Sequence, residues 1–223
     1  MSNKNDPRVV LAGSVSTTRR TLQAMLRHQV NLVGVLGLNA QKSVKVSGYA
    51  RLDDLAGEAN IPYFDFENIN APGIVSAVQQ LQPDLLFVVG LSQMVNDELL
   101  AAPKLACVGF HPTHLPEGRG RAPVAWLAYE SRNGAATFFV MEAGADSGAI
   151  LAQELFLISA QDYASDVTNK MELAIDRALD DWLPRMVVGE WVPISQDHAQ
   201  ATFYGRRAPA DGLISWENLQ QKS

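Results

Sequence analysis

Two segments of the chain carry histidines and an aspartate, residue types that serve together in proton transfer. His111 and His114 lie in one segment, and Asp146 begins an Asp-Ser-Gly sequence further along. A histidine suits general acid–base catalysis, and a carboxylate bonded to it fixes its orientation and favours its charged form. The alternatives are a structural histidine and an ordinary Asp-Ser-Gly turn. If the fold brings the segments together, these residues predict a site for proton transfer.

Two arginines lie between these segments. Arg119 and Arg121 flank a single glycine. The planar guanidinium group suits bidentate recognition of phosphate or carboxylate. The pair therefore predicts a binding site for an anionic substrate, with solvated loop charges as the alternative.

Apolar runs that end in glycine or polar residues indicate strands through the first half of the chain. These runs lie at residues 9–13, 32–36, 61–64, 84–90 and 106–110. Stretches of helical periodicity separate them, and the first is expected to begin at a cap formed by Ser16 or Thr17. Residues 39–47 have no periodicity and predict a loop. This alternation predicts a Rossmann-like, doubly wound α/β fold with a mostly parallel sheet.

The pattern changes after residue 135. Two strands are expected at residues 136–141 and 150–158, followed by a long helix over residues 163–191 that Pro184 could interrupt. The apolar face of this helix is interpreted as core, with a homodimer contact as the alternative. In such folds ligands bind at the carboxyl ends of the parallel strands, so the loop that follows strand 106–110 should carry the chemistry.

Composition limits the class of protein. The chain has 223 residues, 47% hydrophobic and 19% charged, which is typical of one globular α/β domain with at most a short appendage. We expect a catalytic domain over residues 1–195 and a short extension over residues 196–223. A formal net charge of −6 without a basic block argues against nucleic acid as a partner, although tRNA is not excluded.

Other sequence features bear on the cellular compartment and on the cofactors that can be expected. Cys107 is the single cysteine, so no intrachain disulfide can form. The sequence has no secretory signal and no apolar run near the ~20 residues that span a bilayer, which predicts a cytoplasmic protein without a membrane partner. No metal-ligand spacing and no G-x-G-x-x-G sequence occurs, so neither a metal nor a dinucleotide is expected.

The segment around His111 resembles a known family. Residues 109–126 read Gly-Phe-His-Pro-Thr-His-Leu-Pro-Glu-Gly-Arg-Gly-Arg-Ala-Pro-Val-Ala-Trp. This is similar to the signature of the folate-dependent formyltransferases, in which His-Pro-Ser-Leu-Leu-Pro is followed by Arg-Gly. The Asp146-Ser147-Gly148 sequence resembles the family's later Asp-x-Gly. The order and spacing of the two motifs match.

The resemblance implies a formyltransferase fold and a reaction. His111 and Asp146 would be catalytic, 10-formyltetrahydrofolate would be the co-substrate, and the amine of a small molecule would accept the formyl group. Arg119 and Arg121 would bind that substrate. The folate would lie against two loops, whose residues are Leu91, Ser92, Gln93, Met94, Gly144 and Ala145.

Further likenesses point to a branch of the family. Residues 201–216 resemble the segment that closes the catalytic domain of methionyl-tRNA and sugar formyltransferases, and residues 119–123 with Trp126 resemble an enzyme that formylates a UDP-linked aminoarabinose. They favour a nucleotide-linked amino sugar, a substrate type of lipopolysaccharide biosynthesis. A methionyl-tRNA enzyme, which would normally continue into a further domain, and a formyl-folate hydrolase are the alternatives.

One residue departs from the pattern. Gly109 stands where the family has an asparagine whose amide faces the oxyanion of the intermediate. Loss of such a donor typically costs about 2.7–4 kcal/mol in transition-state stabilisation. His114, where the family usually has leucine, is a candidate catalytic replacement, and backbone N–H groups or a water are the alternatives. The departure also permits a catalytically weak protein that binds folate or nucleotide.

Overall fold

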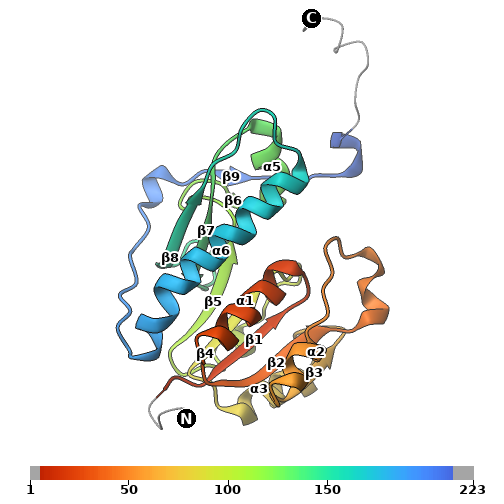
Figure 1. Ribbon diagram of the computed structural model, residues 1–223, viewed down its shortest axis with the longest axis vertical. Helices are drawn as coiled ribbons and strands as arrows, with labels where there is room; N and C mark the ends of the chain where they lie inside the picture. The colour runs from red at the N-terminus through yellow and green to blue at the C-terminus, as the bar shows by residue number, and fades with distance from the viewer. Residues whose placement is uncertain (1–5, 213–223) are drawn as a thin grey trace, which may run out of the picture.

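A single mixed sheet organises the molecule, and the computed structural model describes residues 6–212 (Figure 1). The strand order is β3-β2-β1-β4-β5-β7-β8. The first five strands run parallel, β7 pairs antiparallel with β5, and β8 pairs antiparallel with β7. The expected doubly wound α/β fold with a mostly parallel sheet is confirmed. Its strands are β1 (Val9–Gly13), β2 (Leu32–Leu38), β3 (Tyr63–Phe66), β4 (Leu85–Val89), β5 (Ala106–His111), β7 (Gly134–Val140) and β8 (Ile150–Phe156).

Helices cover both faces of this sheet. One core packs beneath α1 and α6, and a second packs beneath α3 and α4. Figure 1 shows α1 and α6 side by side on one face. The α-helices are α1 (Ser16–Arg27), α2 (Asp53–Glu58), α3 (Pro72–Leu81), α4 (Asp97–Leu100), α5 (Pro123–Glu130) and α6 (Ala164–Val187).

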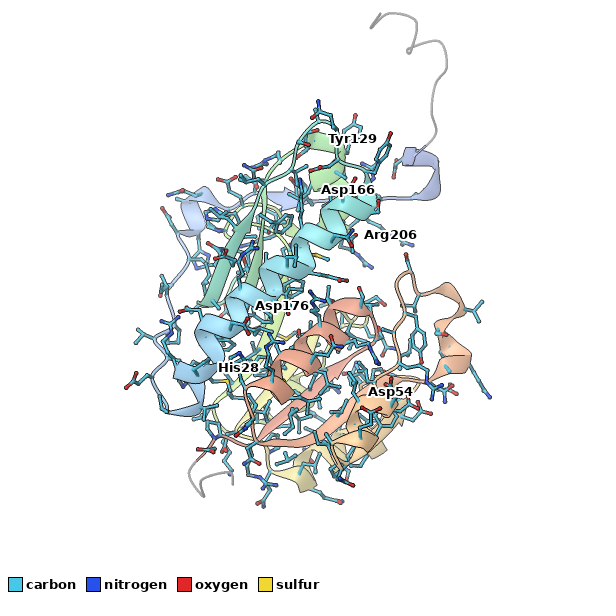
Figure 2. All side chains as sticks on the ribbon, in the orientation of Figure 1. His28, Asp54, Tyr129, Asp166, Asp176 and Arg206 are labelled. Carbon is cyan, nitrogen blue, oxygen red and sulfur yellow. The ribbon has the colours of Figure 1, made fainter. Side chains whose placement is uncertain are left out.

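Ion pairs join helices α1 and α6, which lie side by side on one face of the sheet. On α6, Asp176 forms an ion pair with Arg20 at 2.7 Å, and Asp180 accepts a hydrogen bond from Arg27 at 2.6 Å. His28, at the end of α1, lies 2.7 Å from the same Asp180. Figure 2 labels His28 and Asp176 at this seam. The seam holds the start of the chain against its last long helix.

Helix α1 begins differently from the sequence expectation. Its N-cap residue is Val15, and neither Ser16 nor Thr17 caps it. Instead the buried Thr18 hydroxyl accepts the N–H groups of Ser14 and Val15, at 3.1 and 3.3 Å, and donates to the carbonyl of Val89 at 2.6 Å. This threonine therefore ties the β1–α1 turn to the end of β4.

Two local expectations were wrong, and one helix had not been predicted. Residues 40–45, expected as loop, form a 3₁₀ helix (Ala40–Lys45), whose preceding Asn39 accepts the N–H of Gln41. Helix α6 continues through Pro184 and ends at Val187, because apolar packing of Trp182, Leu183 and Met186 holds its last turns. Helix α5 had no sequence prediction.

A short ribbon completes the described part. Strand β6 (Arg119–Gly120) pairs in parallel with β9 (Phe203–Tyr204). Two further 3₁₀ helices, His198–Gln200 and Pro209–Gly212, flank β9. Within residues 6–212, no helix is both long and apolar enough to cross a membrane.

Candidate active site

His111 ends strand β5, at the carboxyl edge of the parallel part of the sheet. It is buried at 5% exposure and pairs across the sheet with Thr137 on β7. Its Nε2 lies 2.8 Å from the carbonyl oxygen of Gly118. Because a carbonyl only accepts, Nε2 must carry a hydrogen, and the lone pair of the neutral ring is on Nδ1.

Asp146 lies in the turn between β7 and β8 and faces that lone pair. Its Oδ2 is 3.5 Å from His111 Nδ1 and accepts the backbone N–H of Gly120 at 2.8 Å. The backbone of Asp146 has a left-handed φ of 50°, a conformation that residues other than glycine seldom adopt. The fold thus brings together the two residues that the sequence predicts as catalytic.

The protein environment sets the charge of this histidine. Burial lowers the pKa of His111, and the Asp146 carboxylate and the Gly118 carbonyl oppose that effect. The resting imidazole is therefore neutral near pH 7. If Nδ1 takes up a proton, both ring N–H groups already have an acceptor, so the geometry suits a base that gains a proton only in passing.

The position of the family asparagine is filled by neighbouring side chains. Gly109 pairs with Phe139 across the sheet. A Cβ atom at Gly109 would lie 2.8 Å from Phe139 Cζ and 2.9 Å from Met141 Cγ. Glycine supplies no side-chain donor, and an asparagine here would fit only if these two side chains moved.

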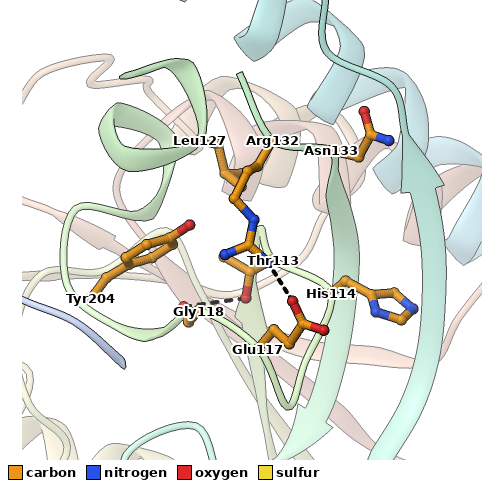
Figure 3. Close-up of a pocket in the computed structure, with 8 residues that line it drawn as sticks. All are labelled: Thr113, His114, Glu117, Gly118, Leu127, Arg132, Asn133 and Tyr204. Atoms are coloured by element: carbon orange, nitrogen blue, oxygen red, sulfur yellow. Dashed lines mark hydrogen bonds and ion pairs between the residues drawn. The ribbon is translucent and has the colours of Figure 1, made fainter. Parts of the chain in front are cut away.

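His114 lies apart from the His111–Asp146 pair. It is exposed and lines a solvent-open hollow, with about 230 Å³ of empty space, that Figure 3 draws. An ion pair between Arg132 and Glu117 crosses this hollow. Among the described residues, no hydrogen bond or ion pair joins His114 to His111 or Asp146. Its role as replacement donor stays a prediction.

The two predicted substrate-binding arginines differ sharply. Arg121 is exposed, and its backbone N–H donates to the Tyr204 carbonyl at 3.1 Å. Arg119 is buried at 4% exposure, and its guanidinium donates to Gln196 Oε1 at 2.6 Å and to His198 Nδ1 at 3.1 Å. As positioned, Arg119 faces protein acceptors, while Arg121 remains available to an anion.

The predicted folate loops lie in two turns. In the first, Leu91 packs into the second core, Ser92 is exposed, and Met94 is 83% exposed. Gln93 uses both ends of its amide, since it accepts the N–H of Ile69 at 2.8 Å and donates to the Glu67 carbonyl at 2.9 Å. Gln93 therefore stabilises its loop, and the exposed Ser92 and Met94 are accessible to a ligand.

The second predicted folate loop is the turn that carries Asp146. Gly144 and Ala145 are exposed. A Cβ at Gly144 would lie 2.2 Å from Ser147 Oγ, which donates to Glu142 at 2.8 Å. Among the described residues, no group of three or more histidine, cysteine, aspartate or glutamate side chains is arranged to hold a metal ion.

Gln196 carries no signal in the sequence. Its buried amide contacts both Arg119 and the Asp146 turn. Residue 196 opens the expected C-terminal extension, and a lone glutamine in an irregular segment carries no pattern. The resemblance of residues 201–216 indicated this part of the chain but not this side chain.

Comparison with known proteins identifies the family. The sequence model of the formyl transferase family matches residues 8–182. Similar solved structures include an N-formyltransferase from Helicobacter canadensis in complex with folinic acid and dTDP-3-aminofucose, 16% identical over 89% of this chain and 70% of that one, with a TM-score of 0.67. Glycinamide ribonucleotide transformylase 1 from Symbiobacterium toebii is 16% identical over 87% of this chain and 96% of that one, with a TM-score of 0.71.

A third solved structure comes from another branch. Methionyl-tRNA formyltransferase from Clostridium thermocellum is 17% identical over 96% of this chain and 80% of that one, with a TM-score of 0.65. At such identities these structures share the fold and leave the substrate open. Since the family match spans most of the sequence, this chain belongs to the formyl transferase family.

Proposed function

We propose that this enzyme transfers the formyl group of 10-formyltetrahydrofolate to the amine of a nucleotide-linked amino sugar. The observation that carries the chemistry is the His111–Asp146 pair, with Nδ1 and Oδ2 3.5 Å apart at the carboxyl edge of the sheet. The folate carrier supplies an activated formyl group. The protein must then supply a base, a place for the acceptor amine and stabilisation of the oxyanion.

The proton has a defined route in this proposal. The acceptor nitrogen forms a bond to the formyl carbon and must lose a proton, while the bond from that carbon to the carrier nitrogen breaks. Asp146, whose side chain is more exposed than that of His111, holds the amine, and His111 Nδ1 takes the proton. The proton passes finally to the departing carrier nitrogen. The turn at Gly144 and the loop at Ser92 and Met94 would flank the folate.

Cationic side chains favour an anionic acceptor. Arg121 and Arg206 are exposed. Arg207 lies over the Trp126 ring at 4.7 Å and over Tyr129, which Figure 2 labels, at 5.2 Å. Guanidinium groups beside aromatic faces suit a nucleoside diphosphate, whose phosphates and base need both. Such an acceptor is a substrate type of lipopolysaccharide biosynthesis.

The test is a transfer assay with competing acceptors. The purified protein is incubated with 10-formyltetrahydrofolate and, separately, UDP- and dTDP-linked amino sugars, glycinamide ribonucleotide and methionyl-tRNA. Mass spectrometry detects the formylated product, and His111→Asn is the control for transfer by the protein itself. Formylation of an amino sugar at the highest kcat/KM is expected.

Each other result replaces the proposal with a defined alternative. Preference for glycinamide ribonucleotide or methionyl-tRNA changes the substrate class. Formate released without an amine product indicates a hydrolase. Folate binding without any turnover indicates a binding protein, for which the filled position beside Gly109 supplies the structural reason.

A further inference from the structure

A buried glutamine from the C-terminal segment connects to the turn that carries Asp146. Gln196 is 7% exposed. Its Nε2 donates to the carbonyl of Asp146 at 2.9 Å and to that of Gly148 at 2.6 Å. Its Oε1 accepts from Arg119 at 2.6 and 3.2 Å. Both hydrogens of the amide and its oxygen are therefore engaged.

Arg119 determines which way this amide points. A guanidinium has donors only, so the Gln196 oxygen must face Arg119 and the NH₂ group must face the two carbonyls. The reversed amide would set donor against donor and oxygen against oxygen. Arg119 is held in turn by His198 and lies 5.9 Å from the Phe203 ring. Arg119 is buried and its guanidinium is bound by protein acceptors, so we assign it a structural role in preference to binding a substrate phosphate.

The Asp146 turn needs external support. Asp146 has a left-handed φ of 50°, which persists only where surrounding contacts hold it. Gln196 binds its backbone on one side, and the Gly120 N–H binds its carboxylate on the other. At Gly148 a Cβ would lie 1.8 Å from the Val140 carbonyl, so the turn is closely packed at the second Gln196 contact as well.

We infer that Gln196 is a positioning residue, which Arg119 orients and which holds the Asp146 carboxylate against His111. Its effect on turnover rests on the proposed function. Its effect on the geometry does not, because the His111–Asp146 contact exists without substrate. The groups that face the His111 ring are the Asp146 carboxylate and the Gly118 carbonyl, with uncharged Thr137 opposite on β7.

Two substitutions separate the contacts of this amide. Gln196→Met keeps the length of the side chain and removes every hydrogen bond. Gln196→Glu keeps an acceptor for Arg119 and removes both donors to the turn. Gln200→Ala is the matched control, since Gln200 is an exposed glutamine of the same segment that donates to Asp197.

Three measurements are made on each variant. They are kcat and KM for transfer, the pKa of His111 from an NMR titration, and hydrogen exchange of the Gly120 amide that donates to Asp146. We expect kcat to fall on the order of 10- to 100-fold with little change in the KM for folate, because a misplacement near 1 Å has an effect of that size. In Gln196→Met the pKa of His111 should fall as the carboxylate moves away, and Gly120 should exchange faster in both variants.

A folded Gln196→Met protein with wild-type His111 titration and Gly120 exchange overturns the inference. If Gln196→Met does not fold, Gln196→Glu decides, since Arg119 remains paired; wild-type Gly120 exchange in that variant overturns it. If the wild type transfers formyl to no amine, the proposed function fails, whereas the two NMR measurements still support or overturn the role of Gln196. A purely structural role would lower the melting temperature and leave both NMR measurements at their wild-type values.

Discussion

At the scale of single residues, the candidate site combines a neutral buried histidine with a carboxylate whose backbone has a left-handed φ. His111 donates from Nε2 to a carbonyl and presents Nδ1 to Asp146. Sequence motifs predicted that these two residues belong to the candidate site. They could not predict the tautomer, which depends on how the loop folds the Gly118 carbonyl back onto the ring. They could not predict the Gln196 contact with the Asp146 turn either, because it joins residues far apart in the sequence.

Replacing the histidine should remove turnover without unfolding the protein. We expect His111→Asn to lower kcat by roughly 100- to 10,000-fold, the range that a positioned proton-transfer group contributes. Steady-state kinetics measure this, with folate binding and circular dichroism as checks on the fold. His28→Asn, at the α1–α6 seam, is the control. Retention of a tenth of wild-type turnover would remove His111 from the central role.

Burial of the same histidine predicts how stability depends on pH. Because the folded-state pKa of His111 lies below its usual value of 6.5, the folded protein binds fewer protons than the unfolded chain below that pH. The stability that this group contributes is present above about pH 6.5 and is lost as pH falls toward the folded pKa. Urea unfolding across this window should give a steeper acid loss for the wild type than for His111→Asn. Equal slopes would contradict the prediction.

Restoring the family asparagine should not restore an oxyanion donor. Gly109→Asn places atoms against Phe139 and Met141, and overpacking of this kind typically destabilises by about 1–3 kcal/mol. We expect lower stability and no gain in rate. Adding Met141→Ala opens space, so the double variant should recover stability relative to Gly109→Asn. Denaturant unfolding and kcat measure the two effects, and a faster Gly109→Asn enzyme would show that the space is not limiting.

At the scale of elements, the sequence predicted the buried strands well and the short connecting elements poorly. The apolar runs predicted β1, β4 and β5 well, because a buried parallel strand is continuously apolar. The ribbon of β6 and β9 had no such signal, since two-residue strands show no periodicity and their pairing joins residues far apart in sequence. The capping rule also missed Thr18, whose hydroxyl bonds to another strand.

The hydroxyl of Thr18 should therefore matter more than an ordinary helical threonine. Thr18→Val keeps the shape but leaves two N–H groups and one carbonyl without this partner, and unsatisfied buried groups cost about 1–3 kcal/mol each. We expect a loss of at least that size in the free energy of unfolding. Thr168→Val on the exposed side of α6, where the hydroxyl donates to Ala164, is the matched control and should be close to neutral. Equal effects would contradict the role assigned to Thr18.

At the scale of the whole molecule, the segment after α6 is packed onto the catalytic part. The Trp126 and Tyr204 rings stack at 5.5 Å, Trp126 Nε1 donates to the Gly205 carbonyl, and Gly118 donates to Thr202. The sequence predicted a boundary near residue 195 from the end of the helical pattern. Contacts across that point depend on the tertiary fold, so the pattern could not reveal them.

A chain that ends at residue 195 tests this boundary. It lacks Gln196, β9 and the partner of Trp126, so the Arg119 guanidinium loses its acceptors. We expect a clearly lower melting temperature and no measurable transfer. Circular dichroism melting and the formylation assay measure both. A truncated chain as stable and active as the full one would make the segment an independent appendage.

The position of Gln196 also affects when the protein becomes an enzyme during its synthesis. The sheet and α6 are complete once residue 187 has left the ribosome, and folding can proceed from the N-terminal side as the chain emerges. The Asp146 turn, however, receives its support from a residue translated fifty positions later. A nascent chain can therefore hold its sheet while its carboxylate is still unfixed. If Gln196 positions this turn as inferred, full activity begins only once residue 196 has emerged, and a product that stops before it keeps the sheet but reacts more slowly.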